Sequence, residues 1–207
     1  MKLQISFDSL DIEHNIAIAR QIVEYCDSIE IGTVPLFKYG SAIVERFRQE
    51  FPKKVLFADT KIVDRGRDVA SIFAQAGADW ISVVAGTSRE VIHGVTSRAH
   101  DLGKKVMLDL IDTNTPGQEA LEAKSLGIDA LLLHQPFDKG ESLTFLEQWD
   151  MVRGNTQLPI YISAKINRES LPQILSLNPD GIIVGQAILE SKDPVAEAQF
   201  FYKKCNP

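Results

Sequence analysis

Three charged residues follow directly after one apolar segment of the chain. Residues 55–58 are Val-Leu-Phe-Ala, and Asp59, Lys61 and Asp64 come next. In an extended chain, residues two apart point to the same side, so Asp59 and Lys61 can face one pocket. An ammonium group kept protonated by carboxylates can stabilise or protonate an enediolate. Surface loops also carry charges, so the context of this motif decides whether it is a candidate site.

Apolar segments of this kind recur about every 25 residues, which indicates repeated strand–helix units. Eight such units in succession predict parallel strands that close on themselves. We therefore expect one α/β domain, a single (β/α)8 TIM barrel over residues 1–207. An open doubly wound sheet is the competing fold, but no Gly-x-Gly-x-x-Gly follows the first strand. The predicted strands begin at residues 3, 28, 55, 80, 105, 130, 159 and 181.

Helical periodicity fills the intervals between these strands. Three similar turns, at 76–79, 126–129 and 178–181, lead into strands, as repeated units would. The predicted helices cover residues 11–25, 42–51, a segment through Val69 and Phe73 that ends at 76–77, 88–102, 116–126, 142–152, 171–177 and 194–203.

In an eight-stranded barrel the catalytic groups lie at the carboxyl ends of the strands. Five of the eight predicted strands end in an ionisable residue, and these residues are Asp8, Glu30, Asp59 with Lys61, Asp109 and His134. Carboxylates that converge in this way need positive charge nearby. Hard oxygen ligands around an open site suit Mg²⁺, and we expect Glu30 and Asp59 to bind it. His134 would be the proton shuttle because imidazole titrates near neutral pH.

Each of these residues also has an ordinary structural interpretation. Asp8 and Asp109 could cap the segments that follow them. His134 could be a hydrogen-bonded structural residue. Asp64 lies beyond the strand and could point outward or reach a neighbouring subunit.

The composition excludes several classes of protein. Of the 207 residues, 44% are apolar, and the net charge is −6 with a pI near 5.3. An acidic chain is a poor nucleic-acid binder, and no apolar run approaches the roughly 18 residues that cross a bilayer. The chain begins directly with a predicted strand and has only Cys26 and Cys205. We therefore expect a cytoplasmic protein that binds neither nucleic acid nor membrane.

The ordered motifs of this chain resemble those of the orotidine 5′-monophosphate decarboxylase suprafamily. The motifs are Asp8, Glu-Ile-Gly-Thr at 30–33, Ala-Asp-x-Lys-x-x-Asp at 58–64, Ala-Gly-Ala-Asp at 76–79, Asp109, His134 and Ile-Val-Gly-x-Ala-Ile at 183–188. Within it, the chain is most similar to the 3-hexulose-6-phosphate synthase family. The related 3-keto-L-gulonate-6-phosphate decarboxylases carry Glu where this chain has Asp109. The resemblance extends over nearly the whole sequence.

The resemblance implies a TIM barrel of the ribulose-phosphate-binding type with Mg²⁺ held by Glu30 and Asp59. It implies a homodimer with shared active sites, in which Asp64 enters the partner's site. His134 would move the proton, and Lys61 with Asp64 would frame an enediolate. The implied reaction condenses formaldehyde with the small phosphosugar D-ribulose 5-phosphate, and Asp8 and Asp109 complete the catalytic set.

The segments expected to bind phosphate depart from the family pattern. The family's Ala-Gly-Gly-Ile after the seventh strand is replaced by Ser163-Ala164-Lys165-Ile166, and Gly185-Gln186 follows the eighth. The segment 134–138 also departs from the family's His-Thr-Gly-x-Asp. We expect Ser163, Lys165, Gly185 and Gln186 to bind the phosphate. A decarboxylase, a divergent phosphosugar lyase and a non-catalytic sugar-phosphate-binding barrel remain the alternatives.

Overall fold

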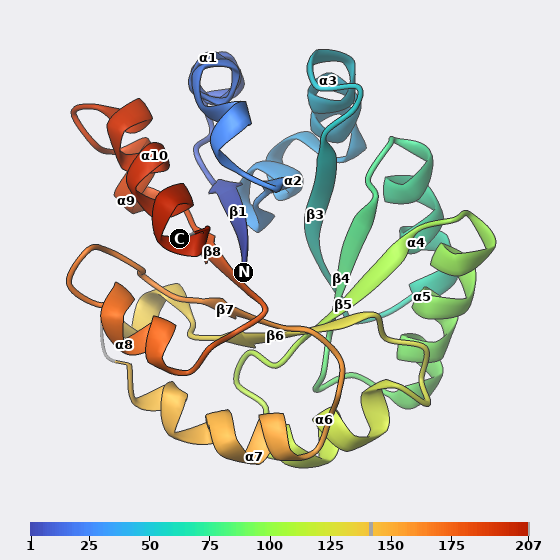
Figure 1. The fold of residues 1–207 in the computed structure, drawn as a ribbon. Helices are drawn as coiled ribbons and strands as arrows, with labels where there is room; N and C mark the ends of the chain where they lie inside the picture. The colour runs from blue at the N-terminus through green and yellow to red at the C-terminus, as the bar shows by residue number, and fades with distance from the viewer. Residues whose placement is uncertain (141–142, 207) are drawn as a thin grey trace.

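Eight parallel strands close into one barrel in their order along the chain (Figure 1). The structure is a computed structural model that describes residues 1–140 and 143–206. Six of the eight predicted strand starts coincide with the observed ones, and the other two differ by one residue. The predicted TIM barrel is confirmed. The strands are β1 (Lys2–Phe7), β2 (Ser28–Ile31), β3 (Val55–Ile62), β4 (Trp80–Val84), β5 (Lys105–Asp109), β6 (Ala130–His134), β7 (Ile160–Ser163) and β8 (Gly181–Val184).

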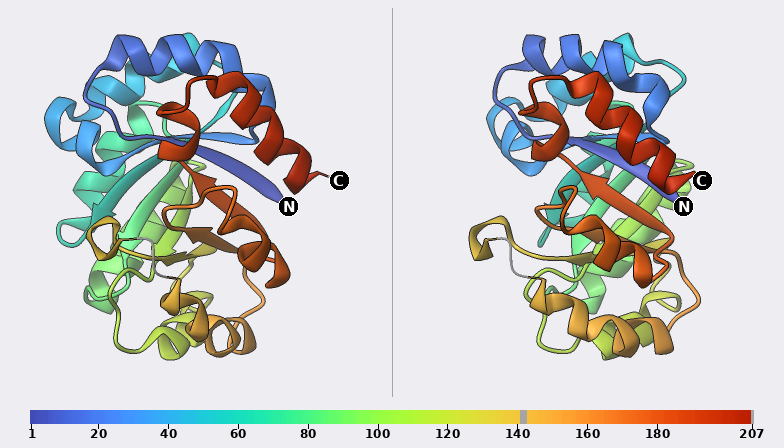
Figure 2. Two further views of the ribbon diagram at one scale, coloured as in Figure 1. Left: turned by 90° about the vertical axis from the view of Figure 1, so that its left-hand side faces the viewer. Right: turned by 60° about the vertical axis from the view of Figure 1, so that its left-hand side comes forward.

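The helices form a layer around the barrel, and the two ends of the described chain lie side by side (Figure 2). Within residues 1–140 and 143–206, no helix is long and apolar enough to cross a membrane. The helices are α1 (Ile12–Ile22), η1 (Val23–Tyr25), α2 (Thr33–Tyr39), α3 (Ser41–Glu50), α4 (Gly66–Gln75), α5 (Arg89–Asp101), α6 (Pro116–Ala123), η2 (Phe137–Lys139), η3 (Thr144–Gln148), α7 (Trp149–Gly154), α8 (Leu171–Ser176), α9 (Gln186–Leu189) and α10 (Pro194–Cys205).

The helices differ from the sequence prediction in several places. The short helices α2 and α9 were not predicted; α2 lies between Gly32 and Gly40 and contains Pro35, and these residues are typical of loops. The predicted helix 11–25 becomes 3-10 from Val23, and the one predicted to end at 126 ends at Ala123. The predicted helix 142–152 is a 3-10 segment followed by α7, and its predicted first residue lies outside the described residues.

The barrel has two separate apolar cores. The larger core lies between strands and helices, and the smaller core fills the inside of the barrel. The smaller core consists of Phe57, Met107, Ala130, Leu132 and Ile183, against which Trp80 and Tyr161 pack. Successive side chains of a strand alternate between these two sides, so alternate positions of each strand line the interior.

The amino-terminal end of the barrel carries a repeated aspartate contact. An aspartate precedes every second strand, and it exchanges two hydrogen bonds with the start of the strand before. Asp79, for example, donates its N–H to the Leu56 carbonyl at 2.8 Å, and its Oδ2 accepts the Leu56 N–H at 3.0 Å. The other pairs are Asp27 with Leu3, Asp129 with Val106 and Asp180 with Ile160. These four contacts give a structural reason for the similar turns noted in the sequence.

Candidate active site

Side chains of the predicted site converge at the carboxyl ends of the strands. Glu30 is in β2, Asp59 and Lys61 are in β3, Asp109 ends β5 and His134 ends β6. Hydrogen bonds join four of them into one cluster. The register of the barrel therefore brings together residues that are up to 75 positions apart in the chain.

Lys61 is the centre of this cluster. Its Nζ lies 2.6 Å from Asp59 Oδ2 and 2.9 Å from Asp109 Oδ2. Burial by itself would lower the pKa of this ammonium group, but Asp59 and then Asp109 reverse the effect and raise the pKa above its ordinary value. The side chain is therefore a fixed positive charge at neutral pH, as the sequence predicted.

Asp109 connects Lys61 to His134. Its carboxylate is fully buried, and His134 Nδ1 lies 3.0 Å from Oδ2. Burial alone would raise the pKa of Asp109, but His134 and then Lys61 outweigh it and the pKa is lowered. Because the Ile111 N–H also donates to Oδ1, Asp109 is held on three sides and fixes the imidazole. His134 faces Asp109 with Nδ1, so its other ring nitrogen, Nε2, points away from this contact.

A bulge in β3 sets the position of Lys61. Ala58 pairs with Ile81 and Ile62 pairs with Val83, so β3 has two more residues than β4 over this interval. Lys61 has φ 43°, in the left-handed region. Asp59 and Lys61 were expected on one side because side chains alternate in a regular strand. That reason is wrong, because the bulge interrupts the alternation, although the two side chains do meet.

Ser82 on β4 holds this bulge from the opposite strand. It is fully buried, its Oγ donates to Asp59 Oδ1 at 2.8 Å, and the same Oγ accepts the Lys61 N–H at 2.9 Å. Thr60 Oγ1 donates to the Ser82 carbonyl and accepts the Ser82 N–H. These side-chain bonds replace backbone hydrogen bonds between β3 and β4 that the bulge interrupts. One hydroxyl therefore positions both Asp59 and Lys61.

Glu30 and Asp59 are crowded carboxylates. Glu30 is 6% exposed, and burial first, then Asp59 and Asp8, raise its pKa to about 8. Lys61 bonds Asp59 and Asp109, and no contact from Lys61 to Glu30 is found in the described part of the chain. Glu30 therefore lies beside other carboxyl groups with no cation from residues 1–140 or 143–206 to compensate its charge, which disfavours its ionised form.

A divalent cation would supply the positive charge that these crowded carboxyl groups lack. Each carboxylate oxygen accepts two hydrogen bonds or fewer, so Glu30 and Asp59 keep lone pairs for a hard metal ion. Over residues 1–140 and 143–206, no group of three or more His, Cys, Asp or Glu side chains is arranged to hold a metal. Glu30 and Asp59 would thus be the two protein ligands of a bound Mg²⁺, an ion that usually keeps several water or substrate oxygens as its other ligands.

Four hydroxyl and amide groups that the sequence analysis missed support these carboxylates. Ser6 Oγ lies 2.8 Å from Glu30 Oε1, and Thr33 Oγ1 donates to Asp59 Oδ2 at 2.7 Å. The other two are Gln4, which donates to Glu30, and Ser82. These residues could have been found in the sequence as polar residues that alternate with apolar ones in a predicted strand, as in Leu3-Gln4-Ile5-Ser6-Phe7.

Asp8 lies at the rim beside Glu30. Ser6 Oγ donates to its Oδ2 at 2.8 Å. A Cβ on Gly32 would lie 1.8 Å from Asp8 Oδ1, so glycine is required at position 32 for the carboxylate to lie there. Asp8 caps no helix, because the N-cap of α1 is Asp11.

Asp64 does not join the cluster. Its side chain is exposed, and within the described residues its only hydrogen bond is with the N–H of Arg65. Exposed apolar residues lie near it in the sequence or on α2, and they are Val34, Phe37 and Val63. Phe37 is the most exposed of them, at 83%.

The predicted phosphate-binding residues lie at the ends of β7 and β8 and in the segments that follow. Two of them, Lys165 and Gln186, contact different partners. Lys165 Nζ lies 3.9 Å from the centre of the Phe137 ring. Gln186 Nε2 donates to Glu190 Oε1 at 3.0 Å. Ser163 and Gly185 are half-buried at the ends of the strands. No contact found in the described residues joins Lys165 to Gln186.

A cavity of about 410 Å³ opens to one side of the cluster. It lies between the segments after β5 and β6, and its lining includes His134, Gln135, Asp112 and Lys139. Lys139 forms an ion pair with Asp112 at its edge. His134 thus lines this cavity as well as contacting Asp109.

The closed barrel, with a carboxylate–lysine–histidine cluster at its mouth, has the arrangement of an enzyme active site. A family model described as Orotidine 5′-phosphate decarboxylase / HUMPS family matches residues 1–201. The chain belongs to this family.

Named relatives agree with this membership. The 3-hexulose-6-phosphate synthase of Bacillus subtilis (strain 168) is 28% identical over 200 residues, which cover 96% of this chain and 95% of the relative. The crystal structure of 3-hexulose-6-phosphate synthase from Salmonella typhimurium aligns with a TM-score of 0.92 at 27% identity, covering 98% of this chain and 97% of that one. A crystal structure of KGPDC from Streptococcus mutans, determined as a ligand complex, aligns with a TM-score of 0.91 at 25% identity, covering 100% and 99%.

Proposed function

We propose that this chain is a Mg²⁺-dependent aldolase that condenses formaldehyde with D-ribulose 5-phosphate. The observation that carries the proposal is the double ion pair of Lys61 with Asp59 and Asp109, next to His134 and Glu30. Curated relatives that match nearly the whole chain bear the name 3-hexulose-6-phosphate synthase. Their names supply the substrate class, and the cluster supplies the chemistry.

In this proposal His134 removes a proton from C1 of the sugar phosphate, and the electron pair of that bond forms an enediolate. Bound Mg²⁺, held by Glu30 and Asp59, would stabilise the negative charge on the enediolate oxygens. Lys61 adds a fixed positive charge beside the same oxygens. C1 then bonds to the formaldehyde carbon, the C=O π bond breaks, and the new alkoxide takes the proton back from His134 to give a hex-3-ulose 6-phosphate.

We further propose that the active unit is a homodimer. Asp64 is exposed and does not bond the cluster of its own chain, and Val34, Phe37 and Val63 are exposed apolar residues. A second copy that covers these residues would receive Asp64 in its own site.

The direct test is formaldehyde-dependent loss of D-ribulose 5-phosphate by the purified protein, with and without chelator. Activity that needs Mg²⁺ and is lost in His134→Asn supports the aldolase. The related decarboxylase reaction is the second candidate, because KGPDC aligns over the whole chain. Release of carbon dioxide from 3-keto-L-gulonate 6-phosphate without formaldehyde consumption would favour it. Substrate binding without either reaction would indicate a non-catalytic barrel.

A further inference from the structure

A chain of hydrogen bonds runs along the inside of the barrel toward Glu30. Ser28 Oγ donates to Gln4 Oε1 at 2.8 Å, and Gln4 Nε2 donates to Glu30 Oε2 at 2.5 Å. The register of β1 and β2 pairs Gln4 with Ser28 and Ser6 with Glu30, so these contacts follow from the fold. The polar chain occupies the side of the interior that the small apolar core leaves open.

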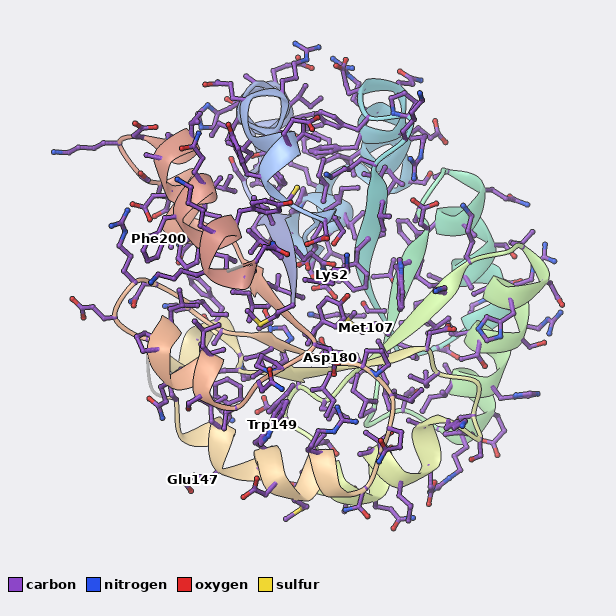
Figure 3. All side chains as sticks on the ribbon, viewed as in Figure 1. Lys2, Met107, Glu147, Trp149, Asp180 and Phe200 are labelled. Atoms are coloured by element: carbon purple, nitrogen blue, oxygen red, sulfur yellow. The ribbon has the colours of Figure 1, made fainter. Side chains whose placement is uncertain are left out.

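The far end of this chain borders a cavity at the amino-terminal end of the barrel. The cavity has a volume of about 210 Å³, and Gln4 and Ser28 line it together with Lys2, Met107, Trp80 and Tyr161. In Figure 3 the labelled Lys2 and Met107 lie toward the centre of the ring of helices, whereas Glu147 and Phe200 lie in the outer layer. The hydrogen-bonded chain therefore connects this end of the barrel to the carboxylates of the candidate active site.

Gln4 is well suited to fix the carboxylate of Glu30. Its side chain is 3% exposed, and its two ends are held by different partners, since Ser28 donates to the carbonyl and Glu30 accepts from the amide nitrogen. Oε1 of Glu30 is 2.8 Å from Ser6, whose single proton is shared with Asp8. Among the described residues, Gln4 is thus the one side chain that donates to Glu30 without a second carboxylate competing for the same donor.

We infer that Gln4 is a positioning residue for Glu30, and that Ser28 acts on the active site only through Gln4. The inference rests on the proposed role of Glu30 as a magnesium ligand. A carboxylate that loses its committed donor rotates more freely and offers its lone pairs to a metal less often. The environment of Ser28, at the opposite end of the barrel, is thereby coupled to the affinity for the metal.

The test compares Gln4→Met, Ser28→Ala and the double variant, with Tyr161→Phe as a control that changes the same cavity without touching the chain. Calorimetry with Mg²⁺ should show about tenfold weaker binding for Gln4→Met and about threefold weaker binding for Ser28→Ala. The double variant should match Gln4→Met alone, because both changes act through one contact. Tyr161→Phe should bind as the wild type does.

A second measurement separates this inference from the proposed function. The ¹³C carboxyl signal of Glu30 in the metal-free protein, assigned with Glu30→Gln, should shift in Gln4→Met and in Ser28→Ala. A wild type that binds no Mg²⁺ would refute the proposed metal site, and the signal would still test the positioning. An unchanged signal, or single effects that multiply in the double variant, would overturn the inference. If Gln4→Met does not fold, Ser28→Ala carries the test.

Discussion

The two sides of the barrel mouth differ in how their polar groups are held. On the side of β3, β5 and β6, Lys61, Asp59, Asp109 and His134 bond one another directly. On the side of β7 and β8, Lys165 lies against an aromatic ring and Gln186 bonds a glutamate. The first side is organised before a substrate arrives, whereas the second must exchange its contacts to bind an anion. The residues proposed for catalysis are therefore preorganised, whereas the residues proposed to bind phosphate are not.

Lys61→Met should have the largest effect, because it removes the cation that joins the two carboxylates. We expect kcat to fall by about a thousandfold or more, since the charge is needed where negative charge develops in the transition state. Steady-state kinetics with D-ribulose 5-phosphate and formaldehyde measure this fall. A variant that keeps a tenth of the wild-type rate would show that the organised side is not the catalytic one.

Mixing two inactive variants tests whether the organised side is completed by a second chain. Lys61→Ala and Asp64→Ala should each be inactive, and reassembly of an equal mixture should restore about a quarter of the wild-type activity. Half of the dimers would be mixed, and one of their two sites would hold both intact groups. Asp68→Ala, an exposed neighbour, serves as the control in place of Asp64→Ala. An active monomer at every concentration would contradict the shared site.

Lys165→Met probes the loosely held side and should act on substrate binding. A lost charge-assisted contact raises KM about tenfold or more, while kcat changes little because the phosphate is remote from the reacting carbon. Phe137→Leu is the matched change, since it frees the Lys165 ammonium from the ring and should not raise KM. An unchanged KM in Lys165→Met would place the phosphate elsewhere.

The last effect concerns stability rather than turnover and comes from Glu30. Its pKa is about 8 in the folded protein and near 4.5 ordinarily, so the folded state binds more protons between these values. The free energy of unfolding of the metal-free protein should therefore fall as pH rises from about 5 to about 8.5. Glu30→Gln should flatten this dependence in urea titrations. Mg²⁺ should restore stability at the alkaline end of this range in the wild type and not in Glu30→Gln.

The sequence predicted the barrel well because its strands are short apolar segments that end abruptly at polar residues. Glu30, Asp109 and His134 were found for the same reason, since the strand end marks the mouth. The geometry of Lys61 could not be found in this way. Its left-handed backbone depends on a bulge against β4, and the hydroxyl of Ser82 that supports the bulge lies in another apolar strand.

The supporting residues were equally hidden. Gln4 and Ser6 are ordinary polar residues in an alternating strand, which typically face solvent in an antiparallel sheet. Only closure of the barrel turns them inward beside Glu30. The helix α2 escaped prediction because Gly32, Pro35 and Gly40 are typical of a loop. These features depend on partners far along the chain rather than on local sequence.

The four aspartate contacts at the amino-terminal end have a consequence for how this chain folds. Each joins residues 20 to 24 positions apart, so each two-strand unit closes a short loop at low entropic cost. The pairing of β1 with β8 is different, because Lys2 and Gly181 are separated by most of the chain. Local units thus gain contacts early, and the long-range seam should be the late, rate-limiting event. The Lys61 cluster, which spans β3 to β6, does not require that seam and can assemble in a barrel that is still open.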